Sequence, residues 1–189
     1  TAALLRLEAV YTLEAPIVVA GYLNSFIRHA NIVKIANIAQ IVNVIAPILT
    51  RGDEILLQSS FYAFEMMATR RDGISLQLTV DGPDFVSEAH GHVKVIDASA
   101  ILDDGKLHLF AVNRSVDEPA DVRIAVAGAS VTGLSSGEIL TGPDAKAANS
   151  FDQPKVVTSE RFYGVEITDG GAALTMPPLS FVALTLNLT

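Results

Sequence analysis

Three side chains in the middle of the sequence have types and spacing that could form a metal site. Glu88, His90 and His92 alternate in the stretch EAHGHVKV, so on a β-strand all three would project from one face. Two imidazoles and a carboxylate can hold a metal ion with an open coordination position. Short motifs of this kind often occur without a metal, and a glycine between two histidines also suits a solvated strand edge. We favour the edge and expect no metal ion and no cofactor, with a His90–His92 metal protein as the alternative.

Thr1 offers a second kind of chemistry. An N-terminal threonine can act as a nucleophile when its own amine serves as the base. The stretch TAALLRLEAVYT, however, has helical spacing, with Leu4, Leu7 and Val10 on one side, and lacks the strand that would present such a residue. We therefore expect Thr1 to be a cut end, with more of the protein lying upstream.

Three amides interrupt an apolar run, VKIANIAQIVNVIAPI at residues 33–48. A buried amide without hydrogen-bond partners costs about 1–3 kcal/mol, so Asn37, Gln40 and Asn43 each need a partner or access to water. Loop amides usually satisfy backbone groups, so we expect Asn43 to bond to the backbone in the turn that follows, and Asn37 to have a structural role in the strand or barrel interior. The residues alone leave Gln40 as either a loop-bonding core amide or a ligand-binding one.

The composition indicates a chain that can form a packed core, and it argues against several classes of partner. Of the 189 residues, 50% are hydrophobic and 18% are charged, as in globular proteins. The net charge of −8 disfavours nucleic acid and anionic membranes as partners. The absence of cysteine excludes disulfides and thiolate metal sites. No window approaches the ~20 apolar residues of a membrane span and no leader is visible, so we expect a cytoplasmic protein without a membrane partner.

Residues 1–73 are predicted to belong to an α/β domain. Thr12 is expected to cap a helix from Leu13 to about His29, in which Pro16 is tolerated within the first turn. The stretch VKIANIA, residues 33–39, is apolar at nearly every position, as a strand buried on both faces should be.

A turn at residues 50–53 is expected to lead into a second helix. Its cap is predicted at Ser59 or Ser60, and Gly73 is predicted to end it. Helix, buried strand and helix are typical of a parallel sheet with covering helices. One such strand needs neighbours, so the pattern itself requires more sheet than this segment contains. The predicted buried face of the second helix consists of Phe61, Phe64, Met67 and Ala68.

Residues 74–189 are predicted to form an all-β domain. Alternating stretches such as VKVIDASAIL and KLHLFAVNR flank the turn Asp104-Gly105 and predict a hairpin. Further strands are expected in DVRIAVAG, FYGVEIT and LSFVALTLNL, separated by turn residues. Many short strands with regular turns indicate a β-sandwich, here of jelly-roll type.

Several segments together resemble glycoside hydrolase family 51, the α-L-arabinofuranosidases. The stretch LNSFIRHANIVKIANIAQIVNVIAPILT, residues 23–50, is similar to the end of that family's catalytic barrel, where a helix is followed by barrel strand eight. LHLFAVNRSVDEP (107–119) and LTMPPLSFVALTLNL (174–188) resemble strands of its C-terminal sandwich. Ala15-Pro16 and Asn31 depart from the family pattern at positions that do not carry its chemistry.

The resemblance implies that this chain is the C-terminal part of a retaining α-L-arabinofuranosidase, namely the last β/α units of a (β/α)8 TIM barrel followed by the sandwich. The two catalytic glutamates of that family lie on earlier barrel strands, and no glutamate of this chain matches their motifs, so we expect no catalytic residue here. The partners implied are an N-terminal part of the same enzyme and arabinofuranosyl-containing glycans, with a homo-oligomer, possibly a hexamer. The resemblance assigns one residue to substrate binding, Gln40, which follows strand eight and reaches the sugar.

An alternative from a different class is a non-catalytic β-sandwich that serves in assembly or in carbohydrate binding. Such a module would be expected to fold without a partner. The alternatives therefore differ in whether the first 73 residues depend on structure that another part of the protein supplies.

Overall fold

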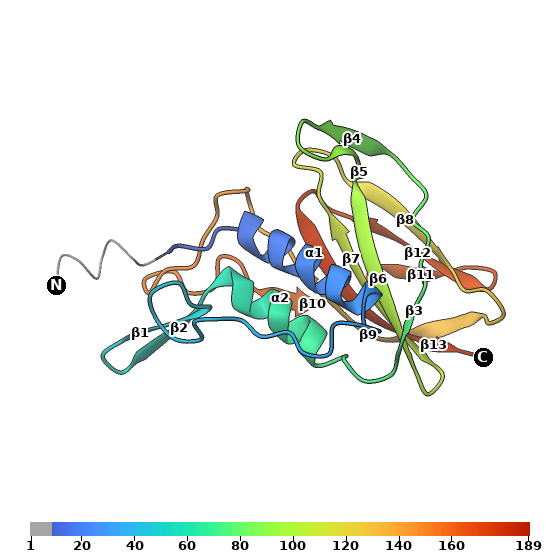
Figure 1. Ribbon diagram of the computed structural model, residues 1–189, viewed down its shortest axis with the longest axis horizontal. Coiled ribbons are helices and arrows are strands. Elements are labelled where there is room, and N and C mark those ends of the chain that lie inside the picture. The colour runs from blue at the N-terminus through green and yellow to red at the C-terminus, as the bar shows by residue number, and fades with distance from the viewer. Residues whose placement is uncertain (1–8) are drawn as a thin grey trace.

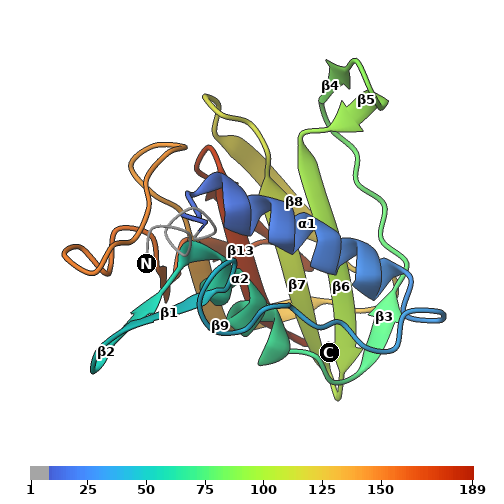
Figure 2. The same ribbon diagram turned by 60° about the vertical axis from the view of Figure 1, so that its left-hand side comes forward.

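The computed structural model describes residues 9–189, which form two packed sheets and two helices. A six-stranded antiparallel sheet with the strand order β10-β9-β13-β7-β6-β3 lies in the middle. The helices lie on one of its faces and a three-stranded sheet, β11-β12-β8, lies on the other (Figure 1). Two small hairpins, β1–β2 and β4–β5, extend from this body, as Figure 2 shows. The elements are α1 (Glu14–Arg28), β1 (Ile48–Arg51), β2 (Glu54–Leu57), α2 (Ser59–Ala68), β3 (Ile74–Leu76), β4 (Asp84–Ser87), β5 (Gly91–Lys94), β6 (Ile96–Asp103), β7 (Lys106–Asn113), β8 (Ala120–Ala125), β9 (Val131–Leu140), β10 (Ser159–Arg161), β11 (Val165–Ile167), β12 (Gly171–Met176) and β13 (Ser180–Leu188).

The mostly β-sheet architecture predicted after residue 73 is confirmed. Alternation places Leu109, Leu184 and Leu174 between the two sheets, while alternate residues of β8 are exposed. Strand β13 is buried over its first seven residues because it pairs with β7 on one side and with β9 on the other. The apolar run LSFVALTLNL is therefore the central strand of the larger sheet.

The hairpin predicted around Asp104-Gly105 is also present. Strands β6 and β7 pair from Asp103 opposite Lys106 to Ile96 opposite Asn113. Both turn residues have positive φ, 41° and 71°, as a two-residue turn between right-twisted strands requires. The Asp-Gly pair thus sets the register of these two eight-residue strands.

Helix α1 spans Glu14–Arg28, close to the predicted limits, but Thr12 does not cap it. The N-cap residue is Leu13, without a side-chain hydrogen bond to the helix. The Thr12 hydroxyl instead lies 3.4 Å from a carboxylate oxygen of Glu14. Ile17 and Ala20 pack in a core shared with α2 and the six-stranded sheet. The burial of this face, rather than a cap, fixes the start of the helix.

Helix α2 is shorter than predicted, and neither proposed serine caps it. Its N-cap is Gln58, because the Ser59 hydroxyl donates to the carbonyls of Tyr11 and Thr12 at 2.9 Å each. The buried hydroxyl of Ser60 has no partner within the described residues. The helix ends at Ala68, five residues before Gly73.

The buried face of α2 also differs from the prediction. Met67 is buried as expected, but Ala63 and Met66 are fully buried apolar positions, and Phe61, Phe64 and Ala68 are only half-buried.

Gly73 does not end the helix but is needed for close packing, since a β-carbon there would collide with the Leu102 carbonyl. It allows β3 to approach β6 closely.

The strand predicted at residues 33–39 does not form. No described strand pairs with this segment, and most of its side chains are half-buried or exposed. A strand needs a hydrogen-bonded neighbour, and among residues 9–189 the nearest pairing is an isolated bridge between Val42 and Ile48. The turn at residues 50–53 is confirmed, and the structure adds the hairpin β1–β2 around it.

No helix within residues 9–189 has both the length and the apolar character needed to cross a membrane.

Candidate functional site

The segment that carries Gln40 leaves the end of α1 and runs back past α2 toward the hairpin β1–β2 (Figures 1 and 2). His29 ends α1, with its Nδ1 2.8 Å from the Ser25 carbonyl oxygen. The amides of Ile32 and Val33 both donate to the His29 carbonyl, at 2.9 and 2.8 Å. These bonds close a tight turn that sends the chain back along the helices.

The far end of the segment is held by a buried glutamine that the sequence did not single out. Gln58 is 1% exposed, and its Nε2 donates to the Ala46 carbonyl at 2.6 Å and to the Ala9 carbonyl at 3.2 Å. Its Oε1 accepts from the backbone N–H of Tyr11 at 3.1 Å. The backbone N–H of Gln58 donates to the Pro47 carbonyl at 2.8 Å. One side chain therefore joins residues 9–11 to residues 46–47. Its position just before a helix start was the only available signal.

Asn43 has the backbone role predicted for it. Its Oδ1 accepts from the amide of Thr50 at 2.8 Å and its Nδ2 donates to the Thr50 hydroxyl at 2.9 Å. The Asn43 amide donates to the Ile48 carbonyl at 2.8 Å. These bonds close the loop between residues 43 and 50, with Asn43 at a φ of 62°, a conformation that asparagine tolerates better than most residues.

Gln40 is in a different environment. Its side chain is exposed and makes no hydrogen bond within residues 9–189. The peptide bond that joins it to Ala39 is cis. Among residues 9–189 the loop-bonding role considered for Gln40 is instead played by Gln58. The two donors and the carbonyl oxygen of the Gln40 amide all remain available to a polar ligand. Asn37 is likewise exposed and lies outside any strand.

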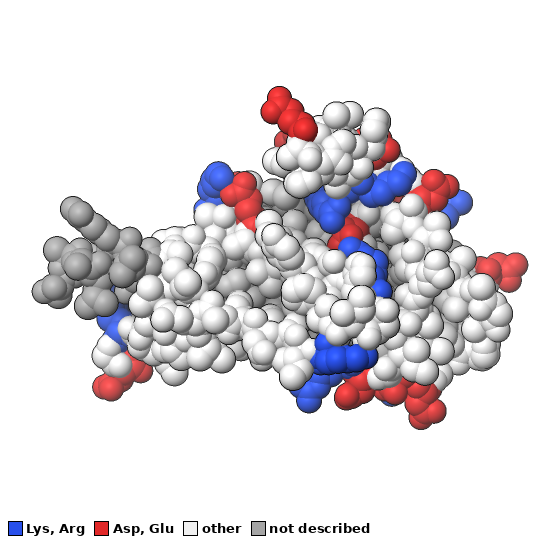
Figure 3. All heavy atoms as spheres, viewed as in Figure 1, with Lys and Arg blue, Asp and Glu red and all other residues white. Residues whose placement is uncertain are grey.

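The surface around Gln40 is unusually apolar. β-branched side chains along the segment are exposed to solvent, and Figure 3 shows a largely uncharged surface over α2, with charged atoms at the end of the neighbouring hairpin. Exposed apolar patches of this kind mark surfaces that contact other structure. The exposed members are Ile32 (73%), Ile35 (76%), Ile41 (62%), Val42 (45%) and Ile45 (47%).

The segment contains one charged side chain, the exposed Lys34, whose Nζ donates to the Ala30 carbonyl at 2.7 Å. Two exposed ion pairs involve the start of α1 and the hairpin β1–β2. Lys146 Nζ lies 2.6 Å from Glu14 Oε2, and this hydrogen bond holds the pKa of Glu14 below its usual value. Glu54 pairs with Arg51 at 2.9 Å, and Arg51 also lies over the Phe151 ring at 4.3 Å. These exposed pairs each contribute little to stability.

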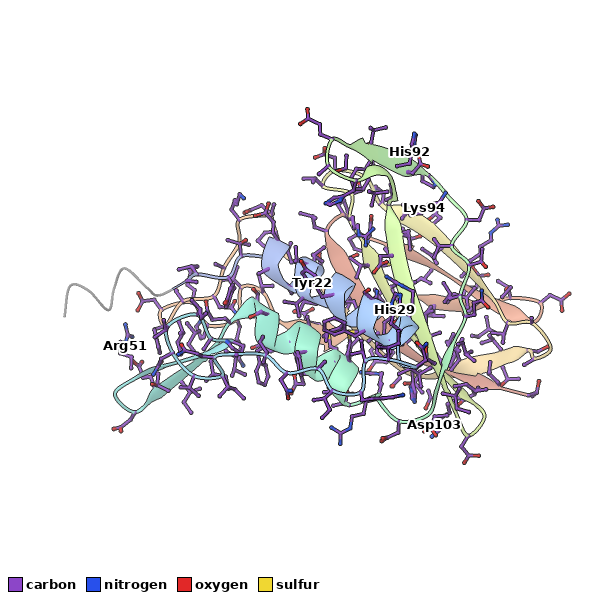
Figure 4. All side chains as sticks on the ribbon, viewed as in Figure 1. Tyr22, His29, Arg51, His92, Lys94 and Asp103 are labelled. Carbon is purple, nitrogen blue, oxygen red and sulfur yellow. The ribbon has the colours of Figure 1, made fainter. Side chains whose placement is uncertain are left out.

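The metal site considered for Glu88, His90 and His92 is not formed. Glu88 and His90 lie in the turn between β4 and β5, and only His92 is on the strand. The turn breaks the alternation that would have placed all three on one face. His92 Nδ1 instead lies 3.2 Å from Asp84 Oδ1 on the outlying hairpin, far from α1 and α2 (Figure 4). Residues 9–189 contain no cluster of three histidine, aspartate or glutamate side chains that could hold a metal.

Thr1, considered as a nucleophile, lies outside the described residues.

Comparison with known proteins identifies the fold. The protein-family model for the α-L-arabinofuranosidase C-terminal domain matches residues 3–180 of the sequence. The chain belongs to this family. It is 30% identical over 177 residues to an intracellular exo-α-(1→5)-L-arabinofuranosidase of Streptomyces lividans, covering 93% of this chain and 27% of that protein. It is also 30% identical over 184 residues to intracellular exo-α-(1→5)-L-arabinofuranosidase 1 of Bacillus subtilis, covering 96% of this chain and 36% of that protein.

A solved structure supports the same assignment for this C-terminal domain. The family 51 arabinofuranosidase of Xanthomonas axonopodis pv. citri superposes with a TM-score of 0.87 at 29% identity, over 96% of this chain and 37% of that one. The resemblance to family 51 is thereby confirmed. The domain spans about a third of the length of the relatives that it matches.

Proposed function

We propose that this chain is the C-terminal part of a retaining exo-α-L-arabinofuranosidase that removes terminal arabinofuranosyl residues from glycans. The observation that carries the proposal is the family match over residues 3–180. The names of the relatives, which are exo-acting arabinofuranosidases, support this activity. In a retaining enzyme two carboxylates about 5–5.5 Å apart act as nucleophile and acid/base. We place both in an N-terminal part, since no glutamate of this chain matches the family's motifs.

We further propose that residues 33–39 are the closing strand of a (β/α)8 barrel. The segment is apolar at nearly every position but lacks a strand neighbour among the described residues, as expected if its neighbours come from the N-terminal part. Helices α1 and α2 would then be two of the barrel's outer helices, with the boundary to a jelly-roll sandwich near residue 73. The shared core of the helices and the six-stranded sheet would make the two domains one rigid unit.

Gln40 is the proposed substrate-binding residue. It follows the proposed strand directly, at the C-terminal end where barrel enzymes bind their substrates. Its exposed amide can donate to one sugar hydroxyl and accept from another, without adding a charge beside two catalytic carboxylates. We also propose a cytoplasmic location, in line with the relatives described as intracellular, and assembly into a homo-oligomer, possibly a hexamer.

The test of this site compares Gln40→Ala with wild type in the enzyme that contains both parts, using an aryl α-L-arabinofuranoside. We expect kcat/KM to fall about 10- to 100-fold, because the lost hydrogen bonds hold the reacting sugar. The matched control is Asn43→Ala, which removes an amide that bonds only the loop at Thr50. It should lower thermal stability more than Gln40→Ala and turnover less. Equal, small effects of the two substitutions on turnover would contradict the role of Gln40.

A further inference from the structure

The outer face of the three-stranded sheet, the face turned away from the sandwich core, contains a polar hollow. The register places Glu166 of β11, Ala173 of β12 and Arg123 of β8 side by side across the sheet. Glu166 and Arg123 are exposed, and the small Ala173 lies between them. The row therefore has long polar side chains at its two ends and only the small side chain of Ala173 in the middle, which leaves space above it.

The neighbouring row continues this hollow. Thr175 lies opposite Asp121, and its hydroxyl donates to Asp121 Oδ1 at 2.7 Å. Gly164, which has no side chain, borders the same space, and the Tyr163 ring beside it is 72% exposed. The hollow has a volume of about 500 Å³.

The size and charge of the hollow indicate its ligand. Two strand spacings separate Glu166 from Arg123, about 9–10 Å between their backbones, which leaves room for one sugar ring above Ala173. No ion pair joins these two side chains within the described residues. The lining contains the carboxylates of Asp121 and Glu166 and the guanidinium group of Arg123. Arg161 lies outside the lining but donates to the Tyr163 hydroxyl at 3.5 Å, so its charge offsets the second carboxylate. A balanced set of charges favours a neutral ligand with many hydroxyl groups over an ion.

We propose that this hollow binds a pentose residue of a neutral glycan chain derived from arabinan or xylan, for which the polymers serve as probes. The exposed Tyr163 ring provides an apolar face for the sugar ring. The carboxylates of Asp121 and Glu166 accept hydrogen bonds from its hydroxyls, and Arg123 donates to its oxygens. The choice of pentose rests on the proposed function, whereas the choice of a neutral sugar rests on the hollow itself.

Affinity electrophoresis of the complete enzyme in native gels containing debranched arabinan or unsubstituted xylan tests the proposal. At least one polymer should retard the wild-type protein. Tyr163→Ala removes the stacking surface and should raise the apparent Kd about fivefold. Ala173→Phe fills the floor of the hollow and should abolish retardation. Both positions are outside the core, and circular dichroism checks that each variant is folded.

The matched control is Phe85→Ala, which removes an exposed aromatic side chain on the hairpin β4–β5 and should leave retardation unchanged. Unretarded wild-type protein in both gels, or equal retardation of wild type, Tyr163→Ala and Ala173→Phe, would overturn the proposal. Hydrolysis of an aryl arabinofuranoside is measured in parallel. Activity without retardation refutes the hollow alone, and retardation without activity refutes the proposed function alone.

Discussion

Two glutamines on either side of the hairpin β1–β2 show how the same residue type takes opposite roles. Gln58 forms hydrogen bonds to three backbone groups through its buried amide, and leaving such bonds unmade would cost about 1–3 kcal/mol. Gln40 forms no such bond within residues 9–189 and is exposed. The first amide fixes the loop, and the second has no partner among residues 9–189. The proposed substrate contact therefore depends on Gln58, which determines where the loop after Gln40 runs.

His108 gives a prediction at the scale of one residue. It is 8% exposed on β7, and its Nδ1 lies 3.0 Å from the Thr185 hydroxyl, which also accepts from Arg70 Nε at 3.3 Å. Burial lowers the pKa of His108 below 6.5, and the Arg70 charge lowers it further. Lys106 acts in the same direction, while Asp103 and Asp72 oppose it. The folded protein thus favours neutral His108.

Protonation of His108 should therefore make the folded protein less stable at acidic pH. Because the unfolded chain takes up a proton more readily than the folded one, the stabilising contribution of neutral His108 is complete above pH about 6.5 and is lost as the pH falls through the lower folded pKa. Thermal unfolding of the complete protein should therefore lose more stability between pH 7 and pH 5 in wild type than in His108→Gln, which cannot gain this charge. Parallel slopes of Tm against pH would contradict the prediction.

At the scale of elements, a polar network joins α1 to β6. The buried Asp97 carboxylate lies 3.0 Å from Arg28 Nη1 and 3.2 Å from Arg114 Nη2, and it accepts from Asn24 Nδ2 at 2.9 Å. The Ser99 hydroxyl donates to Asn24 Oδ1 at 2.7 Å. One carboxylate thus fixes the orientation of the helix that leads into the Gln40 segment.

Replacing Asp97 should be costly. Asp97→Ala leaves two guanidinium groups facing each other. It also leaves the fully buried Asn24 amide only the backbone carbonyl of residue 97, at 3.5 Å, as acceptor, so we expect a loss of about 2–3 kcal/mol in the free energy of unfolding. Asp84→Ala, which breaks an exposed pair with His92, should cost less than about 0.5 kcal/mol. Urea unfolding of the complete protein measures both. Similar costs for the two variants would show that the network does not anchor α1.

The elements also show where sequence patterns are sufficient. The limits of α1 and the β6–β7 hairpin followed from apolar spacing and from Asp104-Gly105, because both signals are local. The caps of both helices were mispredicted, since Thr12 and Ser59 bond to groups other than the helix amides. Residues 33–39 have the composition of a buried strand, but strand formation depends on neighbours that no local pattern supplies.

For the candidate site too, the sequence identified some residues and missed others. Gln40 entered through family resemblance, because composition alone left two roles open for it. Gln58 was missed because its partners, Ala9, Tyr11 and Ala46, come from distant or irregular parts of the chain. The hollow on the outer sheet was missed because it arises from three strands, and only the register brings Glu166 and Arg123 to the two sides of Ala173.

At the scale of the whole molecule, an acidic chain with a net charge of −8 presents one apolar face. The exposed isoleucines and valines of residues 32–45 lie along it, whereas the sandwich has its own buried core. Residues 74–189 also expose apolar side chains, such as Ile74, Val86 and Val116, but residues 32–45 expose five along a single segment. The face is the surface on which the proposed barrel would be completed.

This difference leads to a prediction for the separated parts. The 189-residue chain expressed alone should bind a hydrophobic dye through residues 32–45 and should not hydrolyse an aryl arabinofuranoside, because the catalytic carboxylates are proposed to lie elsewhere. Co-expression with an N-terminal part of about 300 residues, the length left over in a relative of which this chain covers 36%, should restore activity and suppress dye binding. Ile35→Asp should block assembly, since it places a charge where the barrel interior is proposed. The control is Ile167→Asp on the sandwich, which should leave assembly unchanged. Hydrolysis by the isolated chain, or assembly unaffected by Ile35→Asp, would contradict this division of the enzyme.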